Sequence, residues 1–493
     1  MGDMTTSLPV ATASPAAAAA PVRKVAILAI VLSSYFMILL DNSVIFTALP
    51  SLQADLDLST AQLSWVQDAY TLVFGGFLLL GARAGDLLGR RRVFVFGLVV
   101  FSLASLLVGV APTGWWAIAS RALQGIGAAI VAPASLSLIT ASFPAGRERS
   151  RAVALYGATA GIGASLGLVI GGALAHWISW RAGFFVNVPV GLAMILLAPR
   201  YLPETERSRG RFDVVGAVAA TAGVGALVYG IIHAASSSWT DPATIGAIAA
   251  GLVMLALLVL NESRVAAPIM PLHLFASRVR TGAYVARLVY MGGMMGFFYF
   301  TTQYLQGVLG MNPLQAGMGF LPMTAVNFVV AMQIPRLVRR VGERLPLLVG
   351  IALTVVGMAW LGRLGVESTY LVDVALPMLA IGAGQGLVFA PLTSFGIAGA
   401  TEDDAGAASG LVNTFHQLGM AIGLGVLVVI AEQATSGGGA DAAVALAGEV
   451  SAALTGAAVL LALACVAVAV LIAPVTGTRA PSLAAAPGRT VDS

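Results

Sequence analysis

The sequence is a succession of apolar stretches, each about as long as a helix that crosses a membrane. Such a helix needs about 20 mostly apolar residues to cross the hydrocarbon core. Of the 493 residues, 58% are hydrophobic and only 10% are charged, so the chain lacks the polar surface of a water-soluble protein. The pattern predicts an all-α membrane protein with fourteen spans and both ends on the same side. The predicted spans are 25–49, 62–82, 93–110, 115–140, 152–174, 182–199, 213–233, 243–261, 282–305, 314–334, 345–363, 370–396, 406–431 and 450–473.

The arginine residues fall in alternate loops between these spans. The opposite loops carry only Arg181 and Arg363. Basic loops stay on the cytoplasmic side, so we expect a multi-pass protein of the cytoplasmic (inner) membrane with both termini in the cytoplasm. The same asymmetry accounts for the net charge of +4 without nucleic acid as a partner. The basic loops contain Arg83, Arg90, Arg91, Arg92, Arg147, Arg149, Arg151, Arg200, Arg207, Arg209, Arg211, Arg264, Arg278, Arg280, Arg336, Arg339, Arg340 and Arg344.

Two short arginine-rich loops, residues 81–94 and 334–348, are similar to each other. This similarity suggests two related halves, a common plan among transporters. The predicted organisation is a disordered cytoplasmic tail (1–22), an N-terminal six-helix bundle (23–200), two additional transmembrane helices (201–264), a C-terminal six-helix bundle (265–475) and a second cytoplasmic tail (476–493).

Little in the sequence suggests an enzyme. A phosphate-binding loop of the GxxxxGK[ST] kind is missing, and the loops between spans are too short for a soluble domain. The single cysteine, Cys465, excludes an intrachain disulfide and a cysteine metal site, and only four histidines occur. We therefore expect no enzymatic activity, no cofactor and no metal, and a sensor or scaffold would need a signalling domain for which there is no room.

The loop after the second span, GARAGDLLGRRRVF, contains Asp86, Gly89 and Arg90. It resembles motif A of the major facilitator superfamily, although Ala82 stands where the family has its leading glycine. Asp86 and Arg90 are four residues apart, so they can pair with each other or with a neighbouring helix end. A pair that forms in only one state would act as a conformational latch. The alternative is a solvated basic loop.

Two of the charged residues inside predicted spans belong to recognisable motifs, and a charge at such a position is costly and usually functional. The run RALQGIGAAIVAP (121–133) resembles motif B of the superfamily, whose arginine is tied to proton coupling. The run LLDNSVIFTALP (39–50) resembles the first-span motif of the fourteen-span drug/proton antiporters. The resemblance assigns proton coupling to Arg121 and to Asp41. The alternatives are an arginine that reaches the headgroups and a satisfied structural carboxylate.

The run GATAGIGASLGLVIGGAL (157–174) resembles motif C, the antiporter signature, with Leu168 where the family usually has proline. Its glycines recur every four residues and give a smooth face for close helix packing. The helix-packing residues are Gly163, Gly167, Gly171 and Gly172. Together with the first-span motif and the span count, this run identifies the chain as similar to the fourteen-span branch of the superfamily. The expected fold is two six-helix bundles plus two additional helices.

Further polar residues inside the spans are candidates for a substrate cavity. The alternatives are outer water for Asp68, a carboxylate partner for Arg287, a simple hydrogen bond for His416, a polar network with Arg121 for Gln124, and contacts that bind helices together for Gln303 and Asn327. These residues are Asp68, Gln124, Arg287, Gln303, Asn327 and His416.

The resemblance implies a proton-coupled antiporter that exports small amphipathic drugs or toxic compounds by alternating access. The alternative is a dedicated exporter of one metabolite or antibiotic. The expected partners are the substrate, protons and the lipid bilayer, and we expect a monomer.

Overall fold

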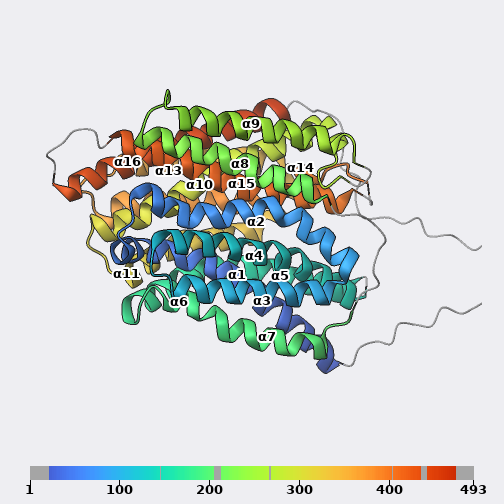
Figure 1. The fold of residues 1–493 in the computed structure, drawn as a ribbon. Helices are drawn as coiled ribbons and strands as arrows, with labels where there is room; N and C mark the ends of the chain where they lie inside the picture. Colours follow the sequence, from blue (N-terminus) through green and yellow to red (C-terminus); the bar gives the residue numbers. More distant parts are fainter. Residues whose placement is uncertain are drawn as a thin grey trace, which may run out of the picture.

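The computed structural model describes residues 21–144, 146–204, 213–265, 268–401, 404–434 and 441–472. The regular structure of these residues is helical, which confirms the predicted fold class (Figure 1). The predicted tails lie outside the described residues, except for Pro21 and Val22, which begin the first helix.

The N-terminal half contains seven helices, of which α6 and α7 together form one span. Two helices follow it before the C-terminal half begins. The bounds are α1 (Pro21–Leu56), α2 (Thr60–Leu88), α3 (Arg90–Gly109), α4 (Gly114–Ser142), α5 (Arg147–Trp177), α6 (Ala182–Phe185), α7 (Asn187–Tyr201), α8 (Val214–Ser236) and α9 (Pro242–Glu262).

The remaining helices, which we call the C-terminal half, include two short π-helical segments that extend longer helices. The bounds are η1 (Leu272–Ala276), α10 (Arg278–Gly307), α11 (Pro313–Gly319), α12 (Leu321–Val341), α13 (Arg344–Leu361), η2 (Tyr370–Ala375), α14 (Leu376–Ile397), α15 (Ala405–Ala434), α16 (Ala442–Ala467) and η3 (Val468–Ile472).

Within the described residues, twelve helical segments are long and apolar enough to cross a membrane. Helix α10, with 30 residues, is not among them, and the described part of α5 contributes only the shorter apolar segment Leu166–Trp177. The fourteen-span count therefore stays a prediction, and α5 and α10 are the two helices on which it depends.

Local sequence determines where helices α2 and α3 begin and end. Helix α2 begins at a capping box, in which Ser59 and Gln62 satisfy each other's backbone N–H groups. It ends at Gly89, whose φ of 102° lies in a region that only glycine adopts readily. The chain therefore reverses sharply into α3, and α2, α3 and α4 pack as neighbours.

Glycines on α4 permit this close packing. A β-carbon added at Gly125 would lie 2.7 Å from the carbonyl oxygen of Tyr70 on α2. One added at Gly127 would lie 2.6 Å from the backbone nitrogen of Phe101 on α3. Because no side chain intervenes, the polar residues of α4 come within hydrogen-bonding distance of α2 and α3.

Helix α8 packs across the seam between the two halves. Its Val224, Val228 and Ile232 form one buried cluster with Leu72 of α2 and with residues of α15. Helix α9 packs on α8 and lies at the outer edge of the molecule, at the top of Figure 1. Only 17% of its apolar window is buried, so most of its surface is left for lipid.

Helix α1 begins and α7 ends on the right in Figure 1, and we call this end of the molecule the basic end because Arg23 and Arg91 both donate hydrogen bonds to carbonyls at the end of α7. Arg23 donates a hydrogen bond to the Tyr201 carbonyl, and Arg278 donates one to the Val470 carbonyl. The first contact joins the start of α1 to the end of α7, and the second joins the start of α10 to the last described helical segment, η3. At the opposite end, Arg181 forms an ion pair with Asp55.

Candidate functional site

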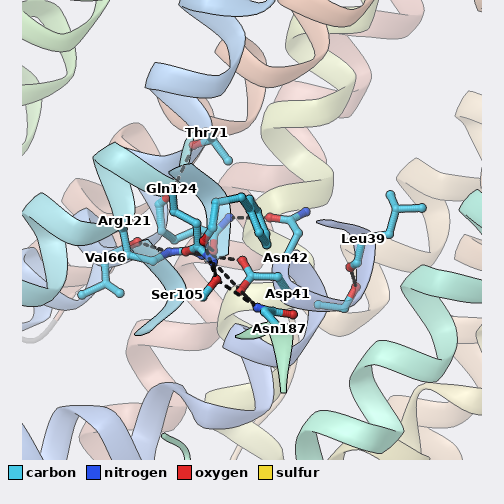
Figure 2. Close-up of polar contacts among 12 residues, drawn as sticks. Leu39, Asp41, Asn42, Val66, Thr71, Ser105, Arg121, Gln124 and Asn187 are labelled. Carbon is cyan, nitrogen blue, oxygen red and sulfur yellow. Dashed lines mark hydrogen bonds and ion pairs between the residues drawn. The ribbon is translucent and has the colours of Figure 1, made fainter. Parts of the chain in front are cut away.

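Asp41 of α1 and Arg121 of α4 form an ion pair inside the N-terminal half (Figure 2). Arg121 Nη1 lies 2.6 Å from Asp41 Oδ2, and both side chains are completely buried. The sequence placed each charge within a span, and the structure joins them across 80 residues of chain. A buried pair of this kind holds its geometry because breaking it would leave an uncompensated charge in a low dielectric.

Neutral polar groups complete the shell around the Asp41 carboxylate. Its Oδ1 accepts hydrogen bonds from the amides of Gln124 at 2.7 Å and Asn187 at 2.8 Å. Gln124 also donates to Ser105 Oγ at 2.7 Å. Four helices, α1, α3, α4 and α7, thus contribute to one network around the carboxylate.

The guanidinium of Arg121 has further partners on α2. Its Nε donates to the carbonyl oxygen of Val66 at 3.1 Å, and Nη2 lies 3.5 Å from Gln67 Oε1. Its Cζ atom lies 4.2 Å from the centre of the Tyr70 ring, a cation–π contact. Arg121 therefore links α1, α2 and α4, so a change in the charge of Asp41 would alter contacts among three helices.

The sequence placed Gln124 one turn from Arg121, where it could share a polar network or line the substrate cavity, and in the structure it bonds to both Arg121 and Asp41. Sequence reasoning missed Asn187, Ser105 and Gln67. Asn187 is 1% exposed and begins α7. A polar amide at the start of an apolar window is a weak signal, since amides and serines are common at such positions.

The glycines of α5 pack on α1 at the level of Asp41. A β-carbon added at Gly163 would lie 3.0 Å from Leu39 Cβ, and one added at Gly167 would lie 2.5 Å from Ser43 Cβ. Gly172 instead faces α11 of the other half, where an added β-carbon would collide with the Pro313 carbonyl. The predicted glycine face thus lies between the helix that carries Asp41 and the C-terminal half.

The loop between α2 and α3 is held by ion pairs at the basic end. Arg90 Nη2 lies 3.2 Å from Asp86 Oδ1, and Arg90 Nη1 donates to the Ser137 carbonyl of α4 at 3.1 Å. Arg91 and Arg92 lie 3.5 and 3.6 Å from Glu204, which follows α7. These partners all belong to the N-terminal half, and whether they act as a latch is a matter for experiment.

The C-terminal half contains a second group of buried and half-buried polar residues. Arg287 of α10 is 6% exposed, and its Cζ atom lies 4.6 Å from the centre of the Phe389 ring of α14. The Phe389 ring lies 6.0 Å from the ring of His416 on α15. Asn327 of α12 donates to Gln385 of α14 at 2.9 Å. The structure therefore gathers Arg287, His416 and Asn327 around α14.

Asp68 and Gln303 do not join this group. Asp68 is fully buried on α2, and neither carboxylate oxygen has a hydrogen-bond partner among the described residues. Gln303 lies four turns beyond Arg287 on α10, and its amide reaches only the Tyr299 carbonyl at 3.5 Å. The described part of the chain holds no group of three or more histidine, cysteine or acidic residues that could bind a metal.

The sequence pattern of the Major Facilitator Superfamily matches residues 31–424, so the chain belongs to this family of membrane transporters. It is 39% identical to the cephamycin export protein CmcT of Amycolatopsis lactamdurans over 83% of this chain and 86% of the relative. It is 38% identical to the puromycin resistance protein pur8 of Streptomyces alboniger over 83% and 82%. It is 35% identical to the multidrug resistance protein Stp of Mycobacterium tuberculosis over 80% and 73%.

Solved transporters share the fold. A structure of the nucleoside transporter NupG superposes with a TM-score of 0.64 at 12% identity, over 90% of this chain and 99% of that one. The xylose transporter XylE from E. coli, in an inward-open conformation, gives 0.62 at 14% identity, over 91% and 96%. The predicted resemblance to the superfamily and its fold is confirmed.

Proposed function

We propose that the protein exports small amphipathic drugs or toxic compounds in exchange for protons. The observation that carries this proposal is the Asp41–Arg121 pair, a fully buried carboxylate and guanidinium in which the carboxylate also accepts hydrogen bonds from the neutral amides of Gln124 and Asn187. Ionisable groups inside a membrane protein commonly mark ion or proton pathways. The relatives, whose names include export, antibiotic resistance and multidrug resistance, support the choice of cargo.

In the proposed cycle, protonation of Asp41 removes the charge that Arg121 pairs with. The guanidinium then loses its strongest partner and is free to move relative to α1. Charge-assisted hydrogen bonds contribute roughly 1.5–3 kcal/mol each, enough to change a two-state population about tenfold or more. An entering proton supplies about 2.3 kcal/mol per 100 mV of membrane potential, which can drive a modest uphill export.

The halves touch at the end opposite the basic end, and these contacts support alternating access. Gln306 of α10 donates to the Thr47 carbonyl of α1 at 3.1 Å, and the rings of Phe46 and Phe298 stack at 5.5 Å. In our proposal this end is closed in the present conformation. Export then requires these contacts to separate while the glycine face of α5 slides on α1 and α11.

We assign the basic end to the cytoplasmic side of the inner membrane, because arginine-rich loops remain on that side. A reporter active only in the cytoplasm should work when fused at Ser208 and fail when fused at Gly438. The reverse result would invert the orientation and with it the direction of transport.

A dedicated exporter of one antibiotic or metabolite is the second candidate, since the cephamycin export protein and the puromycin resistance protein carry single compounds in their names. A growth-inhibition panel of chemically diverse toxic compounds, with and without expression, separates the two. Protection against many classes supports broad export, and protection against one supports the dedicated exporter. Protection against none, with the protein present in the membrane, would contradict both.

A further inference from the structure

We propose that Arg287 is the binding site for the anionic group of a substrate, so that the cargo includes amphipathic carboxylates. This inference rests on the proposed export function and specifies its substrate class. The site consists of Arg287 of α10, Phe389 of α14 and His416 of α15, which we call the Arg287 site.

The first argument is that Arg287 lacks an anionic partner. Its Nε and Nη1 atoms are buried and have no hydrogen-bond partner among the described residues, and it takes part in none of their ion pairs. Arg121 has a carboxylate, an amide and a carbonyl around it in the same molecule. An isolated buried cation is expensive, so a position like that of Arg287 is tolerated when an anion binds there during the working cycle.

The second argument is the chemistry around the guanidinium. The Phe389 ring lies against it, and the Nδ1 atom of His416 is also buried without a hydrogen-bond partner. Gln385 lies one turn from Phe389 on α14, and its amide is held by Asn327. The guanidinium of Arg287 and the imidazole nitrogen of His416 could bind a carboxylate, and the Phe389 ring could contact the apolar part of the same molecule.

The third argument is position. Arg287 is nine residues from the start of α10, and Phe389 is eight residues from the end of α14. At about 1.5 Å per residue, both lie roughly 12–14 Å from the basic end. Arg121 is 21 residues from the end of α4, or about 30 Å from the same end. A molecule arriving from the basic end would therefore meet Arg287 before it reached the Asp41–Arg121 pair.

Partial exposure shows which side chains must move for binding. Phe389 and His416 are partly exposed, whereas Nε and Nη1 of Arg287 are buried and the Phe389 ring lies against the guanidinium. Asn413 lies three residues before His416 on α15, well inside the span, and its polar side chain is exposed. An arriving carboxylate would thus displace the Phe389 ring and exchange a cation–π contact for a charged hydrogen bond.

The test uses full-length protein in lipid nanodiscs and pairs of probes that differ only in charge. Radiolabelled 2-naphthoate is compared with 2-naphthamide, together with three further aryl acid and amide pairs. We expect the acids to bind at least about tenfold more tightly than their amides. In Arg287→Gln the ratio should fall to about one, while amide affinity stays within about twofold.

Arg280→Gln is the matched control, because Arg280 is a buried arginine on the same helix whose donors are satisfied by the Leu274 and Ala398 carbonyls. It should keep the preference for acids. If Arg287→Gln does not fold, Arg287→Lys decides, since a lysine keeps the charge but loses the planar fork. It should reduce the preference at least about threefold.

No preference in the wild-type protein, or an unchanged preference in the Arg287 variants, would overturn the inference. A growth-inhibition panel in cells that express the wild type or the Arg287 variants distinguishes a failure of this inference from a failure of the proposed function. Export of neutral or cationic compounds without any preference for acids would remove only the anion site. Absence of export for every compound would remove the proposed function itself.

Discussion

Asp41 accepts hydrogen bonds from Arg121, Gln124 and Asn187, so its charge is matched to its surroundings. Asp41→Asn keeps the shape of the side chain and removes the titratable group. We expect proton-driven transport to fall by roughly tenfold or more, because the variant can no longer exchange its ion pair for a proton. Transport in everted vesicles under an imposed pH gradient measures this.

The control for this variant is Asp55→Asn. Asp55 is on the same helix and is also paired with an arginine, but it lies in a partly exposed pair at the opposite end. We expect it to transport within about twofold of the wild type, since exposed ion pairs contribute little. Undiminished pH-driven uptake in Asp41→Asn would remove Asp41 from the mechanism.

Arg121→Ala should be far more damaging than Arg363→Ala. The first substitution leaves the Asp41 carboxylate buried without its cation, a change that costs about 3–5 kcal/mol in comparable pairs. Arg363 is exposed near the end of α13. Thermal unfolding in detergent and transport rates in vesicles measure the two effects, and equal losses for the two variants would argue against the assigned role of Arg121.

The chemistry of this site was predictable from sequence, but its geometry was not. Asp41 and Arg121 stood out because a charge in an apolar window has few harmless explanations. Their mutual contact depends on how α1 and α4 pack, which no local pattern specifies. Asn187 and Ser105 were missed because neutral polar residues are inexpensive enough in membrane helices to occur without a function.

At the scale of elements, the face of α5 that packs on α1 offers a direct test of helix sliding. Gly167→Val would place a branched side chain where even a β-carbon meets Ser43 at 2.5 Å. Gly157→Val is the matched control, because an added β-carbon there meets nothing within 4 Å. We expect Gly167→Val to lower the transport rate at least about tenfold, since overpacking costs roughly 1–3 kcal/mol, and Gly157→Val to change it little.

Steady-state transport with matched amounts of protein in the membrane distinguishes these variants. Equal rates would mean that the glycines serve only to fit the helices together during folding. A loss in both variants would point to a general intolerance of α5 to β-branched residues.

The ion-paired loop between α2 and α3 can be tested as a latch. Asp86→Asn removes the carboxylate that pairs with Arg90 in the present conformation. If Asp86 also pairs across the basic end when that end is closed, the variant should favour the state in which the basic end is open. A cysteine placed at Asn413, in a Cys465→Ala background, should then react faster with a water-soluble thiol reagent. Unchanged reactivity together with slower transport would show that Asp86 acts by a route other than gating.

The positions of most spans followed from hydrophobicity, but their internal breaks did not. The window 93–110 agrees closely with α3 (Arg90–Gly109). The window 314–334 covers two helices, α11 and α12, that meet at Phe320. A hydrophobicity window cannot detect such a break, because apolar residues lie on both sides of it. Only the backbone geometry separates the two helices.

At the scale of the whole molecule, α8 is a helix shared by both halves. It contacts Leu72 of α2 and Leu418 of α15 in one buried cluster. The two halves must move relative to each other during alternating access, so this cluster is a place about which they can turn. The contacts at the end opposite the basic end, between α1 and α10, are then the ones that must separate.

A reversible crosslink between α1 and α10 tests this motion. Cysteines at Phe46 and Phe298, in the Cys465→Ala background, replace rings that stack at 5.5 Å and are within reach of a short bis-methanethiosulfonate reagent. Holding these helices together should keep the opposite end closed and stop transport, and reduction should restore it. The single-cysteine variants, treated in the same way, control for modification alone. A crosslinked protein that still transports would show that α1 and α10 stay together through the cycle, and the closed end would have to open elsewhere.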